Sequence, residues 1–197
     1  MRRRYSVLLS LFFLGFFADA VLAKSEPQKI TQQLFYDVLQ VVRQNNLTDR
    51  QKSGTKLLER YFDFSTFAEW TMEDHWSRLS DNQRRAFLQL FKKRFYERVL
   101  EKISRTTNKK FLLKMISKRR EKEYVELKYR LKHNGHRTPF SLMWIKKNDS
   151  WRLVDVTIAK ANLVANYQGQ FNKIIRDYGF EELLDRLEKG KLDKPTH

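Results

Sequence analysis

The stretch YVELKYRLKHNGHRTPFSLMWIKKNDSWRLVDVTI, residues 124–158, decides the fold. Apolar residues recur at every second position along most of it, a period that is typical of half-buried β-strands. Asn134-Gly135 is the strongest short hairpin signal in a sequence, and KNDS at 147–150 indicates a second turn. The preceding segment FLLKMISK begins the same period. We therefore predict four antiparallel strands, near 111–118, 124–132, 139–146 and 151–158.

The two turns also predict which residues oppose each other. A two-residue loop at 134–135 pairs Tyr129 with Phe140 and Val125 with Trp144. A turn at 148–149 pairs Trp144 with Leu153 and Leu142 with Asp155. Directly opposed residues share a face of the sheet. One face is predicted to carry Val125, Leu127, Tyr129, Leu131, Phe140, Leu142, Trp144 and Leu153, with Asp155 and Thr157 among them.

Helical patterns flank the predicted strands. Apolar residues at helical spacing predict a first helix over 30–42, and after a polar stretch at 45–54 a short helix capped by Asp63 or Ser65. Ser80 and Gln83 form the reciprocal N-terminal capping pattern of a long amphipathic helix over 81–104. A further helix over 161–178 ends at Gly179, and a short leucine-bearing helix follows. Helices, then strands, then helices predict one α+β domain with an antiparallel sheet.

The first 23 residues have the pattern of a secretory signal peptide. MRRR is a positive segment, VLLSLFFLGFF is apolar, and small residues at Ala20 or Ala23 mark the cleavage site. We expect residues 1–23 to be removed and residues 24–197 to form a single domain in the bacterial periplasm. The chain has no Cys, which excludes disulfides and thiolate chemistry. Its net charge of +17, or +15 without the three Arg and one Asp of residues 1–23, suggests an anionic surface or partner.

Motifs for enzymatic chemistry are missing. The sequence has no Walker-type phosphate loop, no GxGxxG and no GxSxG, so ATP hydrolysis and esterase chemistry are not expected. His133 and His136 flank the predicted turn, but two imidazoles without a third ligand make a poor zinc site. We predict no metal, no cofactor and no catalytic residue.

Asp155 is the strongest candidate for a residue with a specific structural or functional role. A carboxylate on an apolar sheet face is costly unless it is hydrogen-bonded or paired. The preferred interpretation is that it accepts hydrogen bonds and pins the last strand to the following helix. A polar contact at a ligand site and a general base remain alternatives.

Two segments resemble the toluene-tolerance or MlaC family, the periplasmic phospholipid-binding component of the bacterial lipid-asymmetry ABC transport system. In WRLVDVTIAKANLVANYQGQFNKIIRDYGFEELLDRL, residues 151–187, the family pattern is met by Asp155, Val156, Leu163, Val164, Asn166, Tyr167, Gln170, Phe171, Ile174 and Ile175. In WSRLSDNQRRAF, residues 76–87, it is met by Trp76, Leu79, Ser80, Gln83 and Phe87. Gly169 departs from the pattern, because a larger residue is usual there.

The resemblance implies an NTF2-like domain whose apolar pocket, between sheet and helices, holds lipid acyl chains. It implies a carrier that moves phospholipid between the inner-membrane ABC transporter, with its ring-forming lipid-binding subunit, and an outer-membrane lipoprotein complex. Nucleic acid is not an expected partner. The residues expected to line the pocket are Phe91, Phe95, Val125, Leu127, Tyr129, Phe140, Leu142, Trp144, Leu153, Thr157, Leu163, Val164, Tyr167 and Phe171.

Three other functions are compatible with the sequence. A hopanoid-type lipid could replace phospholipid as the ligand. An NTF2-like enzyme would use Asp155 as its base, and would need a second titrating group in the pocket. A protein that binds anionic envelope surfaces through its basic residues would need no pocket, and its binding would weaken steeply with salt.

Overall fold

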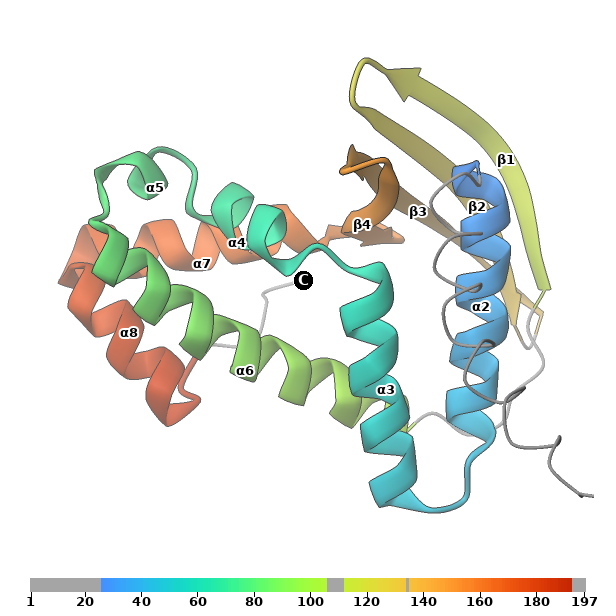
Figure 1. Cartoon of the computed structure of the whole chain (residues 1–197), viewed down its shortest axis with the longest axis horizontal. Helices are drawn as coiled ribbons and strands as arrows, with labels where there is room; N and C mark the ends of the chain where they lie inside the picture. Colours follow the sequence, from blue (N-terminus) through green and yellow to red (C-terminus); the bar gives the residue numbers. More distant parts are fainter. Residues whose placement is uncertain (1–25, 106–111, 134, 193–197) are drawn as a thin grey trace, which may run out of the picture.

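The computed structural model describes residues 26–105, 112–133 and 135–192, without the side chain of His133. The predicted signal peptide, residues 1–23, lies outside this part of the chain. Within the described residues no helix combines the length and the apolar character needed to cross a membrane. The fold is α+β, with a curved antiparallel sheet and two groups of helices (Figure 1).

Five strands form the sheet, in the order β1-β2-β3-β4-β5. They are β1 (Leu112–Glu121), β2 (Tyr124–His133), β3 (His136–Lys147), β4 (Ser150–Ile158) and the two-residue β5 (Ala161–Asn162). The first four confirm the predicted strands, and β5 was not predicted because two residues carry no period. The predicted register of β2 on β3 is confirmed, since Tyr129 opposes Phe140 and Val125 opposes Trp144.

The predicted register of β3 on β4 is right at Trp144, which opposes Leu153, and wrong beyond it. A β-bulge gives β4 one extra residue, Val154, so that Met143 opposes Asp155 and Leu142 opposes Val156. Asp155 therefore lies on the sheet face of Met143, not on the apolar face of Leu142 and Trp144.

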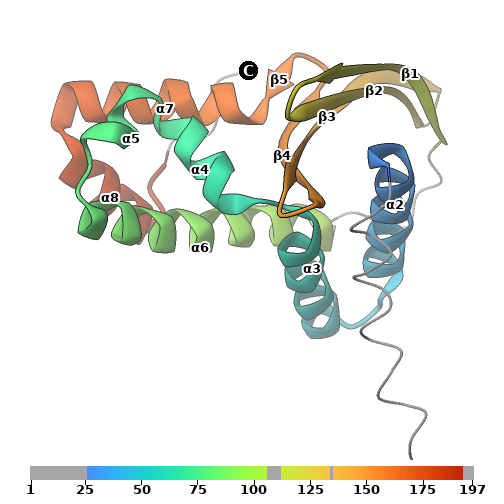
Figure 2. The same ribbon diagram turned by 45° about the horizontal axis from the view of Figure 1, so that its top comes forward.

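Two helices lie on the concave side of the sheet. Helix α2 (Pro27–Arg43) lies under its concave face (Figure 2), where Phe35 meets Tyr129 and Phe140 at ring-centroid distances of 6.1 and 5.8 Å. Helix α3 (Leu47–Tyr61) packs against α2. Its first half falls in the stretch that we expected to be non-helical. The signal for it was Asn46, whose side chain accepts hydrogen bonds from the amides of Thr48 and Asp49 as an N-cap.

The other helices form a body beside the sheet (Figure 2). They are α4 (Phe64–Met72), α5 (Asp74–Arg78), α6 (Asp81–Arg105), α7 (Leu163–Tyr178) and α8 (Phe180–Lys189). The predicted reciprocal cap of α6 is confirmed: the Ser80 amide donates to Gln83 Oε1 at 3.0 Å, and the Gln83 amide donates to Ser80 Oγ at 3.3 Å. Gly179, at a φ of 89°, ends α7 as predicted.

Candidate functional site

The concave face of the sheet is apolar and closely covered. Val125, Leu127, Leu142 and Trp144 are at most 1% exposed, although they belong to neighbouring strands of an open sheet. Burial at this level means that α2 and the helical body exclude water from this face. The indole Nε1 of Trp144 has no hydrogen-bond partner among the described residues.

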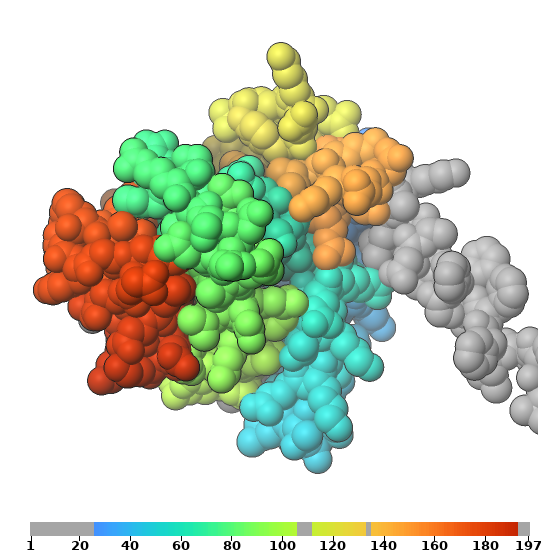
Figure 3. All heavy atoms as spheres, turned by 60° about the vertical axis from the view of Figure 1, so that its left-hand side comes forward, coloured from blue at the N-terminus to red at the C-terminus, as the bar shows by residue number. Residues whose placement is uncertain are grey.

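A second apolar group lies inside the helical body. Phe67 of α4, Phe91 and Phe95 of α6, and Tyr167 and Phe171 of α7 meet with ring centroids 4.9–6.4 Å apart. These separations are those of rings in edge or offset contact. Figure 3 views the molecule from the end of this body, where α8 (red) packs against α6 (green).

Phe62 joins the two apolar groups. It follows α3, forms a bridge to Leu153 of β4, and contacts the rings of Phe67 and Phe95 at 5.2 and 5.1 Å. The amide of Asp63 donates to the Leu153 carbonyl at 2.8 Å, which fixes this link to the sheet. Sheet face and helical body therefore share one continuous apolar interior.

Most residues expected to line a pocket lie in this interior. Thr157 is the exception, because the bulge places it opposite Ser141 on the other face, where it accepts a hydrogen bond from Asn162 at 2.9 Å. The expected residues that are brought together are Phe91, Phe95, Val125, Leu127, Tyr129, Phe140, Leu142, Trp144, Leu153, Leu163, Val164, Tyr167 and Phe171. Their side chains fill the space between them, and a pocket open to a ligand among them stays a prediction.

Asp155 lies where β4 gives way to α7. Its Oδ1 accepts from the Val156 amide at 2.8 Å and from the Val164 amide, in the first turn of α7, at 3.1 Å. Its Oδ2 accepts from the side-chain amide of Asn162. Asn162 in turn caps α7, because its Oδ1 accepts from the Ala165 amide at 2.8 Å. The carboxylate thus contacts both the strand and the helix, the arrangement that a pinning role requires.

Burial raises the pKa of Asp155, while the hydrogen bonds from Asn162 and the backbone amides oppose that rise. The group is 7% exposed, and both of its oxygens already accept hydrogen bonds. A general base needs an oxygen that reaches a substrate proton. The geometry therefore favours a structural role over a catalytic one.

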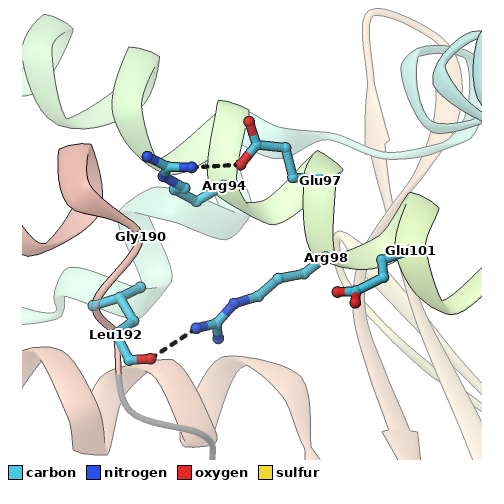
Figure 4. Close-up of a pocket in the computed structure, with 6 residues that line it drawn as sticks. All are labelled: Arg94, Glu97, Arg98, Glu101, Gly190 and Leu192. Atoms are coloured by element: carbon cyan, nitrogen blue, oxygen red, sulfur yellow. Dashed lines mark hydrogen bonds and ion pairs between the residues drawn. The ribbon is translucent and has the colours of Figure 1, made fainter.

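A polar surface pocket of about 390 Å³ lies between α6 and the chain that follows α8 (Figure 4). Its lining includes Arg94 and Arg98, neither of which was predicted to be a site residue. Arg94 donates to the carbonyls of Leu187 and Glu188 at the end of α8 and to Glu97. These contacts hold α8 on α6 and satisfy the guanidinium within the chain.

The fold and site define a class of protein. A curved antiparallel sheet with a helix under its concave face, joined by a continuous apolar interior to a second helical body, is an NTF2-like α+β arrangement with no metal-binding cluster among its described residues. A profile of the family described as MlaC protein matches residues 28–189, and the chain belongs to the MlaC family.

A solved structure has the same fold. It is the phospholipid-binding protein of Ralstonia solanacearum, determined in complex with a phospholipid, with a TM-score of 0.72 and 17% sequence identity over 85% of this chain and 97% of that one. A comparison with curated protein sequences found no match.

Proposed function

We propose that this protein is a periplasmic phospholipid carrier that buries acyl chains in the apolar interior between the sheet and the helical body. The observation that carries the proposal is the extent of that interior. It runs without a polar break from the sheet face of Leu127 and Trp144, through Phe62, to the ring cluster around Phe91. Membership of the MlaC family and the phospholipid held by the structural neighbour support it.

The energetics agree with a carrier. Two acyl chains contain about 30 methylenes, each worth about 0.8 kcal/mol of transfer free energy, so a lipid leaves a bilayer for water at a cost of about 24 kcal/mol. A protein interior that offers a similar apolar environment removes most of this cost. Because the bilayer offers the same environment, uptake and release are nearly balanced, and partners set the direction of transport.

Lipid entry requires the interior to open. Phe91 and Tyr167 lie with ring centroids 4.9 Å apart, which leaves no room for a chain between them. The sheet and the helical body are joined at Phe62-Asp63 and at the β4–α7 junction, and α3 also packs against α6. We infer that the two parts separate around these connections to admit acyl chains, with Asp155 holding the junction while they do.

The proposed setting follows from the same function. Residues 1–23 act as a cleaved signal peptide, and the carrier exchanges lipid with the inner-membrane lipid-asymmetry ABC transporter, through its ring-forming subunit, and with the outer-membrane lipoprotein complex. The family match and the apolar segment of the N-terminal sequence support this assignment.

The test is native mass spectrometry of the protein purified from a bacterial periplasm in high salt, with lipid analysis of the extract. We expect a stoichiometric phospholipid mass. The double variant Phe140→Ser, Leu163→Ser changes two half-buried interior residues and should lose most of that lipid while remaining folded.

The matched control is Leu47→Ser, Tyr178→Ser, which removes apolar groups that are 61% and 65% exposed. It should keep its lipid. Equal retention in the two double variants would refute the interior as the binding site, and a protein without lipid even after incubation with vesicles would refute the carrier function.

A further inference from the structure

The convex face of β1, β2 and β3 is strongly cationic. This face is turned away from α2, which occupies the concave side (Figure 2). Alternation along the strands and the observed register place six cations on it: Lys114, Arg119, Lys128, Arg130, Lys132 and Arg137. All six are exposed. Two acids share this face in the described part of the three strands: Glu126 lies 3.6 Å from Arg119 and 3.5 Å from Lys128, and Glu121, at the end of β1, lies 3.3 Å from Arg119.

The other four cations have no ion-pair partner among the described residues. Lys114, Arg130, Lys132 and Arg137 form a block near the end of the sheet where β2 turns into β3. Lys114 lies directly opposite Arg130, and Lys132 lies directly opposite Arg137. Like charges directly opposed across a ladder destabilise a sheet. The fold therefore carries a repulsion that no contact within the described chain relieves.

Two cations on the concave face of β1 differ from those of the block, because they have an ion-pair partner. There Lys118 lies 3.0 Å and Arg120 3.6 Å from Glu26, which precedes α2. These two cations are thus compensated by the acid that precedes α2, whereas the four cations of the convex block have no such partner among the described residues. Compensation is available in this sequence, and its absence from the block indicates that the block meets an anion from outside the chain.

Apolar side chains lie exposed beside this block. Leu112 is 70% exposed and directly opposes Lys132 on the same face. Ile116, at the bulge of β1, is 48% exposed. Exposed apolar groups bordered by cations are the combination that binds at the headgroup region of an anionic bilayer.

We propose that this cationic sheet face, defined by Leu112, Lys114, Arg130, Lys132 and Arg137, docks the protein on the surface of an anionic lipid bilayer. An acidic protein would match the charge, but the exposed Leu112 and the broad, helix-free face fit a bilayer better. The inference rests on the proposed function in one respect, since a lipid carrier has reason to approach a membrane. Docking holds the carrier at its lipid source while the interior opens.

The experiment is sedimentation of the purified protein with large unilamellar vesicles, either phosphatidylethanolamine with a quarter phosphatidylglycerol or pure phosphatidylcholine. We expect binding to the anionic vesicles that weakens by at least tenfold between 50 and 500 mM NaCl. Each cation near an anionic surface strengthens binding roughly fivefold. The variant K114Q/R130Q/K132Q/R137Q should therefore bind on the order of several hundredfold more weakly.

The control removes the same charge from exposed positions on helices, in K52Q/K56Q/K93Q/K173Q, and should lose less than about tenfold. Thermal unfolding separates docking from folding, because the face variant should melt no lower than the wild type once its like charges are removed. Native mass spectrometry separates docking from carriage, because the face variant should retain its lipid. Equal losses in both variants, or no binding of the wild type to anionic vesicles, would overturn the proposal.

Discussion

Asp155→Asn tests the junction between sheet and helical body. The side-chain oxygen of Asn162 accepts a hydrogen bond from the Ala165 amide, and a flip of the side-chain amide would break that bond. The NH₂ group of Asn162 must therefore keep facing residue 155. An Asn at 155 presents one oxygen instead of two. That oxygen can accept hydrogen bonds from the amides of Val156 and Val164. The NH₂ group of the Asn at 155 would then face the NH₂ group of Asn162, and neither could accept a hydrogen bond from the other.

The magnitude follows from one lost hydrogen bond at a buried site. A buried donor left without an acceptor costs about 1–3 kcal/mol. Because burial raises the pKa of Asp155, removing the charge returns part of the desolvation cost. We therefore expect the lower part of that range, about 1–2 kcal/mol, which is a fall in melting temperature of roughly 2–8 °C for a chain of this size.

The assay is thermal unfolding followed by circular dichroism, with Asp149→Asn as the control. Asp149 lies in the β3–β4 turn with its side chain 89% exposed, so its change should stay within about 0.5 kcal/mol. In the double variant Asp155→Asn, Asn162→Asp, the NH₂ group of the Asn at 155 can donate to the carboxylate at 162, and Asp remains a good N-cap for α7. This variant should recover at least half of the stability that Asp155→Asn loses. An Asp155→Asn protein as stable as the control, or a swap that recovers nothing, would refute the pinning role.

Three further predictions concern stability measured by urea unfolding. Burial would raise the pKa of Asp63, but hydrogen bonds that include one from Lys147 at 2.8 Å hold it below its usual value. Its contribution to stability is therefore fully present above the ordinary pKa of the group and is lost as pH falls through the lowered pKa, so Asp63→Asn should destabilise more at pH 7 than at pH 3. Phe91→Ala removes a fully buried ring and should cost about 3–5 kcal/mol, and a loss below 1 kcal/mol would contradict the close packing described. Gly179→Ala should cost about 1 kcal/mol because φ is 89° there, whereas Gly169→Ala, in an open position of α7, should stabilise by up to about 1 kcal/mol.

Local signals in the sequence were sufficient for much of the fold. Asn134-Gly135 predicted the β2–β3 register at every pair, because a two-residue turn leaves no freedom in which residues oppose each other. Ser80 with Gln83 predicted the start of α6 for the same reason, since both capping bonds are local. The first half of α3 was missed because its sequence, LTDRQKSG, is polar, and its helicity depends on packing against α2 and α6.

The candidate site was less predictable. The apolar lining followed from alternation wherever the ladder is regular, as at Leu127 and Trp144. Alternation failed in β4, where Leu153 and Val154 are both apolar and both buried, so that either phase fits the sequence. The face of Asp155 and Thr157 depends on that phase. The pocket at Arg94 was not foreseeable either, because it forms from contacts between residues more than 90 positions apart.

The surplus residue in β4 allows one strand to do two tasks. Leu153 and Val156, on either side of the bulge, both contribute to the apolar wall, while Asp155 between them faces the start of α7. A strand of strict alternation could not place side chains three positions apart on the same face. If Val154 were instead paired in a strictly alternating ladder, Asp155 would face the hydrocarbon-like interior and lose its contact with the start of α7. The unpaired residue of this strand, and not only its composition, therefore shapes the interior and anchors the helix beside it.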